Sequence, residues 1–258
     1  MFSQGIIYAD IDVEKINTLR VKNMSFENNS QQVEILDAKV ENNSNDLKFR
    51  YVDAHPFVPD NDDKRRERCR EIFSIQAGAL AKRLEHVGST GAVVGISGGL
   101  DSTLALLVCT KAMSLLGKEN SDILGVTMPG FGTTGRTYNN ALKLMNCLGV
   151  TVREVDIKEA CMLHMRDIEH DADIHDITYE NTQARERTQV LFDLANKHGK
   201  LLVGTGDLSE LAMGWCTYNG DHMSMYGVNA SVPKTLVRYL VDLSLIHISE
   251  PTRLRRIS

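Results

Sequence analysis

The sequence predicts an α/β fold with a doubly wound, mainly parallel sheet. Three observations lead to this prediction. Short β-branched runs alternate with longer helical stretches, a glycine-rich turn follows the first run of the main region, and 42% of the 258 residues are hydrophobic. Parallel strands need a crossover helix between them, and the alternation supplies one each time. The apolar content is enough for a large core.

The first part of the chain differs from the rest. A short apolar run at Gly5–Ala9 predicts a strand, and polar, Asn-rich sequence follows it up to Asn45. This part has too little apolar content to form its own core. The dense charge run at 60–70 predicts the solvated start of a helix, which continues to Leu84 with an apolar stripe on one side.

From there the pattern predicts four strands separated by helices of ten or more residues. Strands buried on both faces read as short apolar runs, and such sheets bind ligands beyond the carboxyl ends of their strands. The expected strands are 92–96, 123–127, 151–156 and 201–204, and the expected helices are 102–116, 138–148 and 182–198.

Composition excludes several classes of protein. A net charge of −5 gives no basic field for nucleic acid, and no apolar run reaches the roughly 20 residues that a membrane span needs. The five cysteines are odd in number and contain no C-x-x-C pair, which argues against a disulfide framework or a zinc knuckle. We therefore expect a cytoplasmic protein that binds small substrates.

A strand, a tight glycine turn and a helix follow one another at the predicted ATP site. Glycines let backbone N–H groups surround an anion, and the helix N-terminus adds partial positive charge. Asp101 suits such a site only with a divalent cation beside the phosphates, which predicts Mg²⁺ with ATP. A plain turn with a helix cap is the alternative, but this arrangement is more specific than a bare Gly-Gly. The candidate ATP-binding residues are Gly95, Ile96, Ser97, Gly98, Gly99, Leu100, Asp101 and Ser102.

This loop resembles that of the ATP pyrophosphatases, which cut ATP between the α and β phosphates. Residues 128–131, 179–185, 204–210 and 214–221 narrow the likeness, because together they resemble the NAD synthetase pattern. The resemblance covers roughly 52–241 and implies the Rossmann-like ATP pyrophosphatase (adenine nucleotide alpha-hydrolase) fold.

The resemblance implies an ATP-dependent amidation of deamido-NAD by ammonia through an adenylated intermediate, with release of AMP and pyrophosphate. Asp101 and Glu210 would be catalytic and hold magnesium, and Thr205 would contact ATP. Asp221 is a weaker candidate for guiding ammonia. Taken singly, these residues could be helix caps, surface charges or core. The implied deamido-NAD contacts are Asn181, Glu210, Trp215, Cys216, Thr217 and Tyr218.

The resemblance also implies a longer enzyme. Residues 1–54 resemble the end of a nitrilase-like glutaminase domain plus a linker, and 55–242 an incomplete synthetase domain. Glutamine would then supply the ammonia, and the full-length enzyme would form a homo-oligomer. Residues 243–258 are expected to be non-native, because 243–253 translate a transposon adapter used in shotgun sequencing.

Three alternatives remain open. The chain could be another amidotransferase or ligase of the ATP pyrophosphatase type, or a nucleotide-binding module without catalysis. The acidic, His-containing stretch at 169–176 could suggest a metallohydrolase, although no second ligand cluster is spaced to close its site. Arg185 and Arg187 could be surface charges rather than phosphate clamps, and they are not included among the candidate site residues.

Overall fold

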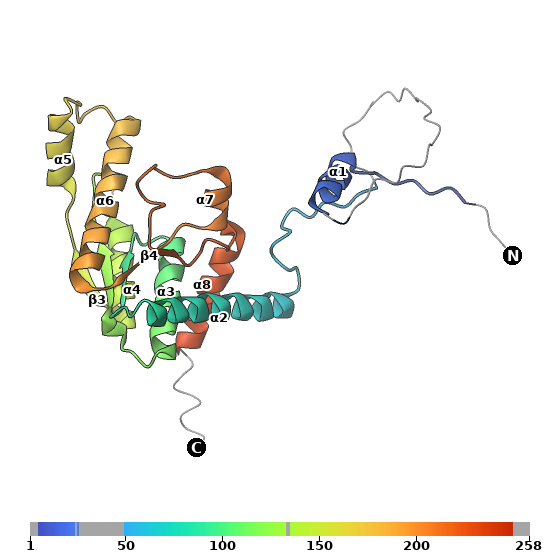
Figure 1. Cartoon of the computed structure of the whole chain (residues 1–258), viewed down its shortest axis with the longest axis horizontal. Coiled ribbons are helices and arrows are strands. Elements are labelled where there is room, and N and C mark those ends of the chain that lie inside the picture. The colour runs from blue at the N-terminus through green and yellow to red at the C-terminus, as the bar shows by residue number, and fades with distance from the viewer. Residues whose placement is uncertain (1–4, 24, 26–48, 133–134, 250–258) are drawn as a thin grey trace, which may run out of the picture. The chain divides into compact units, whose positions relative to one another are not determined.

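The computed structural model describes residues 5–23, 25, 49–132 and 135–249, which fall into two compact units, 1–56 and 57–258 (Figure 1). Among its described residues, the first unit holds one helix, α1 (Val13–Lys22), which has no buried residue. The prediction of a strand at Gly5–Ala9 was wrong. These residues are irregular, because no strand pairs with them within the described residues and an unpaired strand leaves its backbone unsatisfied.

The second unit is built on a parallel sheet with strand order β3-β2-β1-β4-β5. The four expected strands are confirmed, with β3 ending two residues earlier than predicted. The fifth strand was not predicted, since two residues carry no periodicity. The strands are β1 (Ala92–Gly95), β2 (Ile123–Thr127), β3 (Thr151–Glu154), β4 (Leu201–Gly204) and β5 (Tyr226–Gly227).

Helices connect and cover these strands. The expected helices are present, and three shorter or later ones were not predicted. Within the described residues none is long and apolar enough to cross a membrane. The helices are α2 (Asp62–His86), α3 (Leu100–Leu115), α4 (Gly135–Leu148), α5 (Lys158–Asp167), α6 (Ile177–His198), α7 (Leu208–Met213) and α8 (Lys234–Ser249), with a 3-10 turn η1 (Asn120–Asp122).

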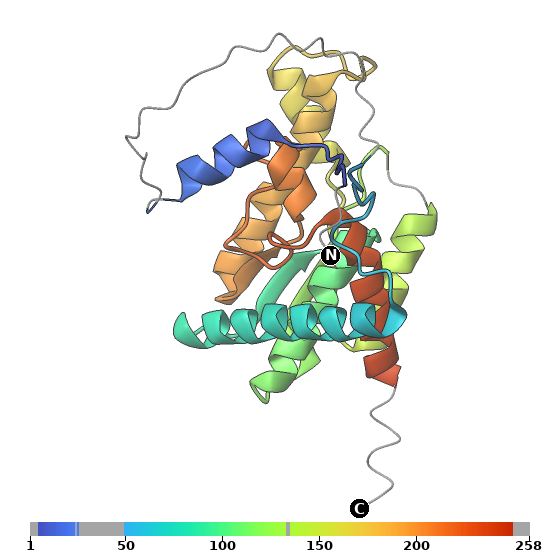
Figure 2. The same cartoon turned by 90° about the vertical axis from the view of Figure 1, so that its right-hand side faces the viewer.

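The sheet has a core on each face, which confirms the doubly wound arrangement. On β1, Ala92 and Val94 join the apolar cluster formed with α2, α3, α4 and α8, whereas Val93 joins the cluster formed with α5 and α6. Side chains of a strand alternate between faces, so one strand serves both cores. In Figure 2, α2 crosses α3 on the first of these faces.

One helix start differs from the sequence expectation. Helix α6 begins at Ile177, five residues before the predicted start, so Asn181 lies inside it and caps nothing. The cap is Asp176, whose Oδ1 accepts hydrogen bonds from the N–H groups of Thr178 and Tyr179. An aspartate at this position satisfies two donors that the helix leaves unpaired.

At the other end of the chain, α8 continues to Ser249 and buries Leu243 and Ser244. The expected origin of 243–258 stays a prediction, and 250–258 lie outside the described residues.

Candidate active site

The predicted phosphate loop runs from the carboxyl end of β1 into α3. Gly98 has φ +85, and a Cβ there would lie 2.2 Å from the Thr137 carbonyl oxygen, so only glycine fits. The Ser97 hydroxyl accepts from the Gly99 N–H at 3.3 Å and lies 3.2 Å from the Ser102 hydroxyl. These contacts fix a tight turn beneath the helix start.

The start of α3, which follows the glycine turn, suits an anion; α5 also starts without a side-chain cap, but no glycine turn precedes it. Helices α2, α6 and α7 are capped by the side chains of Asn61, Asp176 and Asp207. The N-cap of α3 is Gly99, which makes no side-chain cap hydrogen bond. The first N–H groups of α3 therefore keep their donors available, and the helix dipole favours negative charge there.

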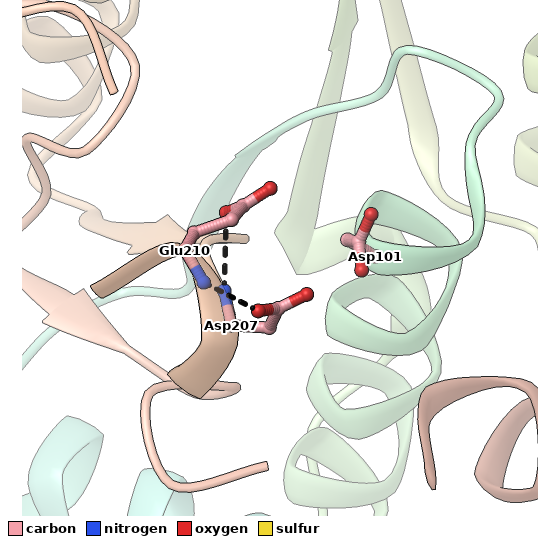
Figure 3. Close-up of side chains that lie close together, drawn as sticks. All are labelled: Asp101, Asp207 and Glu210. Atoms are coloured by element: carbon pink, nitrogen blue, oxygen red, sulfur yellow. Dashed lines mark hydrogen bonds between the residues drawn. The ribbon is translucent and has the colours of Figure 1, made fainter. Parts of the chain in front are cut away.

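An acidic cluster faces this loop. Carboxylate oxygens of Asp101, Asp207 and Glu210 lie within 4.8 Å of one another (Figure 3). Asp207 accepts from the Glu210 N–H at 3.0 Å, and Glu210 accepts from the Asp207 N–H at 3.2 Å, which makes a capping box at the start of α7. Because β1 and β4 are neighbouring parallel strands, the turns that follow them meet at one edge of the sheet.

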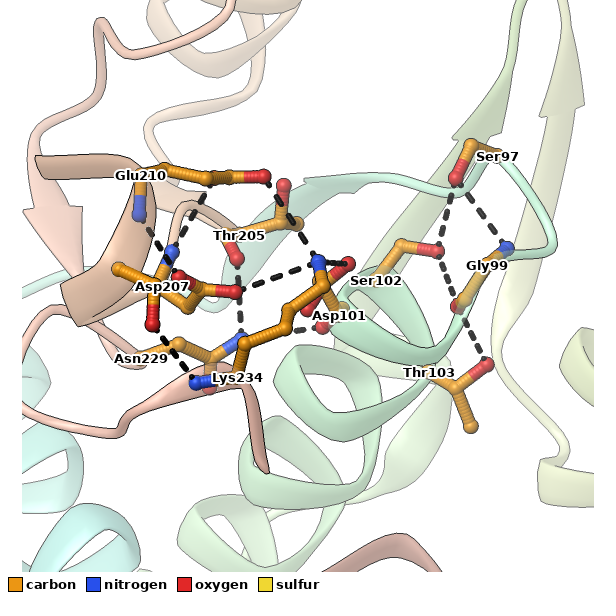
Figure 4. Close-up of polar contacts among 11 residues, drawn as sticks. Ser97, Gly99, Asp101, Ser102, Thr103, Thr205, Asp207, Glu210, Asn229 and Lys234 are labelled. Atoms are coloured by element: carbon orange, nitrogen blue, oxygen red, sulfur yellow. Dashed lines mark hydrogen bonds and ion pairs between the residues drawn. The ribbon is translucent and has the colours of Figure 1, made fainter. Parts of the chain in front are cut away.

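The ammonium group of Lys234 lies among the three carboxylates (Figure 4). Its Nζ is 2.6 Å from Asp101 Oδ2, 3.2 Å from Asp207 Oδ2 and 3.8 Å from Glu210 Oε1. Burial opposes its charge, but the hydrogen bond and charge of Asp101, reinforced by Asp207, hold the pKa of Lys234 above its ordinary value. Burial raises the pKa of Glu210, and the Asp207 charge adds to that rise.

The cluster fits a divalent cation. The Asp101 Oδ1 atom is buried and has no hydrogen-bond partner among the described residues, so it has accepting capacity left over. Asp207 is fully buried and contributes a second oxygen beside Lys234. Converging carboxylate oxygens are the ligands that Mg²⁺ takes in proteins, together with phosphate oxygens.

A cavity of about 660 Å³ opens over the loop and the cluster. Most of the predicted site residues line it. Gly98, Gly99 and Leu100 are not among its lining residues; they form the turn beneath it. The predicted residues that line the cavity are Gly95, Ile96, Ser97, Asp101, Ser102, Thr205, Glu210, Trp215 and Cys216.

The rest of the predicted substrate set forms a second group outside the cavity lining. The Thr217 hydroxyl donates to Asn181 Oδ1 at 2.9 Å, and the Thr217 N–H donates to Asp221 Oδ1 at 2.7 Å. Asp221 itself lines the cavity. Trp215 is 75% and Tyr218 78% exposed, so their rings present open faces. The structure thus joins Asn181 to the loop after α7 but leaves the aromatic side chains uncovered.

Sequence reasoning missed two polar members of the site. Asp207 lay inside the 204–210 motif but was passed over. Lys234 follows a proline, a residue that is typical of helix starts and was the one available signal.

A third residue was misread. The interpretation of Arg187 as a surface charge was wrong: its side chain lines the cavity, and burial lowers its pKa. Arg185 is exposed and donates to the Tyr218 carbonyl oxygen.

The described side chains of residues 169–176 do not form the metal site that the metallohydrolase alternative requires. His170 Nε2 lies 3.4 Å from Asp176 Oδ1, and Asp176 serves as the cap of α6. Among the described residues, the only group of three or more acidic, His or Cys side chains that converges on one point is the Asp101 cluster.

The sequence model that describes the NAD synthase family matches residues 73–249 of this chain. The chain belongs to the NAD synthase family. Among curated proteins it is 42% identical over 246 residues to the glutamine-dependent NAD(+) synthetase of Mycobacterium bovis, covering 90% of this chain and 36% of that protein. It is 36% identical over 148 residues to the NH(3)-dependent NAD(+) synthetase of Pyrobaculum aerophilum, covering 57% of this chain and 54% of that protein.

A solved structure agrees with this membership in fold. The glutamine-dependent NAD+ synthetase of Acinetobacter baumannii, solved with ADP, aligns with a TM-score of 0.62 and 32% identity over 67% of this chain and 32% of that one. The chain therefore spans about a third of the length of the two glutamine-dependent synthetases just described.

Proposed function

We propose that the chain carries the ligation site that converts deamido-NAD to NAD. In this reaction ATP activates the substrate carboxylate, ammonia replaces the activating group, and AMP and pyrophosphate leave. One observation carries the proposal. The start of α3, which no side chain caps, and the cluster of Asp101, Asp207 and Glu210 lie at the same edge of the sheet, and one cavity opens over both. Membership in the NAD synthase family supports the choice of substrate.

The chemistry explains why ATP is needed. A nicotinate carboxylate reacts poorly with ammonia because the leaving group would be oxide. When a carboxylate oxygen attacks the α-phosphate, the bond to the β-phosphate breaks and pyrophosphate leaves. Ammonia then attacks the carbonyl carbon of the adenylate, loses a proton, and expels AMP. Both steps develop negative charge on phosphate oxygens, which preorganised donors stabilise.

The residues of the site divide this work. The glycine turn and the N–H groups of α3 hold the pyrophosphate, and the Ser97 and Ser102 hydroxyls add donors. Asp101 and Glu210, with Asp207, would hold magnesium, which would supply positive charge to neutralise the phosphate oxygens. Thr205 contacts the nucleotide from the turn after β4, on the cavity wall.

The loop after α7 takes the deamido-NAD end. Trp215 offers an exposed ring face for stacking, and Cys216 lies beside it on the cavity wall. Asn181 fixes the loop through Thr217, while Asp221 lies between this loop and the cavity, where it would guide ammonia. Exposure of the Trp215 and Tyr218 rings agrees with a homo-oligomer in which a second subunit adjoins this loop.

Glutamine is the proposed nitrogen source of the longer enzyme, in the cytoplasm, with a glutaminase domain preceding this region. The curated relatives include both glutamine-dependent and NH(3)-dependent synthetases. The ligation site itself needs only ammonia, so the two sources can be separated by assay.

The test is NAD formation by the purified chain with ATP, Mg²⁺, deamido-NAD and an ammonium salt, each omitted in turn. We expect AMP and pyrophosphate in amounts equal to the NAD formed. Formation of ADP and phosphate would contradict the ATP pyrophosphatase reaction, and turnover that survives omission of deamido-NAD would contradict the substrate. Replacing ammonium by glutamine in the same assay tests the nitrogen source.

A further inference from the structure

Asn229 is a fully buried polar residue in the turn after β5. Its side-chain nitrogen donates to the carbonyl oxygen of Asp101 at 3.0 Å and to that of Thr205 at 3.0 Å (Figure 4). The first acceptor belongs to the first turn of α3 and the second to the turn after β4. One amide group therefore joins the carboxylate turn to the nucleotide turn of the proposed site.

The orientation of this amide is fixed by its surroundings. Carbonyl oxygens only accept, so the nitrogen of Asn229 must face Asp101 and Thr205. Its oxygen faces the other way and accepts from Gln76 Nε2 at 3.1 Å. Gln76, buried on α2, also donates to the Val228 carbonyl oxygen at 2.8 Å. The relay of amides thus starts on α2, outside the cavity, and ends at the site.

The bond to Asp101 goes beyond what the helix requires. Asp101 lies in the first turn of α3, where the helix ladder pairs its carbonyl oxygen with the N–H four residues on. The carbonyl has a second lone pair, and Asn229 uses that one. Burying an amide is costly unless it is hydrogen bonded, and the amide nitrogen of Asn229 forms its two hydrogen bonds with backbone atoms of the site. Such an arrangement fixes a separation between turns.

We propose that Asn229 is a positioning residue of the ligation site: it sets the distance between the metal-binding Asp101 and the nucleotide-binding Thr205, and Gln76 sets its orientation. This inference rests on the proposed function. Because Asp101 would hold magnesium and Thr205 would contact ATP, the two hydrogen bonds of Asn229 make magnesium and ATP bind cooperatively. Loss of these hydrogen bonds weakens the cooperativity more than it weakens the binding of either ligand alone.

Neighbouring contacts of the same segment support this role. The Val232 carbonyl oxygen accepts from the Leu208 N–H at 2.9 Å, and the Lys234 N–H donates to the Ser209 hydroxyl at 3.1 Å. The Lys234 ammonium then reaches Asp101. Residues 228–234 are therefore tied both to the start of α7 and to the start of α3.

The experiment measures ATP affinity of the whole 258-residue chain with Mg²⁺ and with EDTA, by calorimetry or by fluorescence of Trp215, its single tryptophan. In Asn229→Ala we expect the Mg–ATP affinity to fall about tenfold, which corresponds to about 1.4 kcal/mol. The gain in ATP affinity on adding Mg²⁺ should shrink by a similar factor. In Gln76→Met, which leaves Asn229 in place, we expect the Mg–ATP affinity and the gain on adding Mg²⁺ each to fall about threefold.

The control is Met165→Ala, which removes a fully buried side chain of α5 in the core on the other face of the sheet from α2. It should lower the melting temperature while leaving the magnesium-dependent gain unchanged, as any merely structural defect would. A folded Asn229→Ala chain with an unchanged gain overturns the proposal; if that variant does not fold, an unchanged gain in Gln76→Met overturns it. Absence of Mg–ATP binding in the wild-type chain would instead contradict the proposed function.

Discussion

The two ends of the proposed site differ in how much of their geometry the chain itself provides. At the phosphate end, Asp207 is fully buried, the cluster is hydrogen bonded, and Asn229 links the two turns that carry it. At the substrate end, Trp215 and Tyr218 are about three-quarters exposed, and the loop around them is held through the hydroxyl and the N–H of Thr217. Groups that stabilise developing charge work best when they are preorganised, whereas a stacking surface can be completed by the ligand.

The largest effect should come from the metal carboxylate. Asp101→Asn keeps the shape of the side chain but removes its charge, so we expect NAD formation to fall about 100-fold or more, since metal stabilisation is worth several kcal/mol. The measurement is kcat/KM with saturating ammonium. Glu71→Gln, which removes one carboxylate from the exposed surface of α2, is the matched control and should be neutral. Equal activity in the two variants would remove Asp101 from the mechanism.

The glycine turn should be the most sensitive part of the backbone. Gly98→Ala places a Cβ 2.2 Å from the Thr137 carbonyl oxygen at a positive φ, so we expect a loss of about 2 to 3 kcal/mol in the free energy of unfolding. Gly99→Ala is the control, because its Cβ would meet only the Ser97 hydroxyl, at 3.4 Å, with φ −84. Denaturant titration of both variants decides, and equal losses would contradict the steric account.

Removal of Lys234 tests whether the acidic cluster depends on an internal cation. Lys234→Met leaves Asp101 and Asp207 without their ion pair, and we expect a loss of about 1 kcal/mol, kept small because Lys234 is half exposed. Magnesium should recover part of the loss in a thermal melt. Lys82→Met, which breaks the exposed pair with Glu85, should change neither quantity. If Mg²⁺ did not change the melting temperature of Lys234→Met, this would argue against a metal at this cluster.

The smallest effect should lie at the open end. Trp215→Ala should raise the KM for deamido-NAD about three- to tenfold, the range of one aromatic contact, and leave the melting temperature unchanged because the side chain is 75% exposed. Trp215→Phe keeps a ring and should recover most of the affinity. A large drop in melting temperature in either variant would show that Trp215 packs as core.

The sequence allowed the fold to be predicted well where consecutive residues carried a clear local pattern. The apolar runs at β1, β2 and β4 and the glycine turn each carry a local signal, and each was found. The failures have local causes. Gly5–Ala9 has the composition of a strand but no strand partner in the described part of the chain. The start of α6 was set by Asp176, a cap that the residue pattern did not reveal against the nearby polar residues.

Prediction of the site residues divides in the same way. Thr205 directly follows β4, and Asp101 and Glu210 lie in the first turns of the helices that follow β1 and β4, so parallel-sheet geometry brings them to one edge. Asn229 and Lys234 stand outside the motifs used for prediction, and nothing in their neighbours marks them as polar partners of the cluster. Their contacts with Asp101 span more than 120 residues of chain, which no local pattern encodes.

By itself, the sequence determined the strand, turn and helix of the phosphate loop and the resemblance to NAD synthetases, because both are written in consecutive residues. The tertiary structure alone decided that Asp207 and Lys234 complete the cluster, that Arg187 lines the cavity, and that Asn229 joins the two turns. Hydrogen bonds and ion pairs reach only about 3 Å, so whether distant side chains meet depends on how the strands and helices pack.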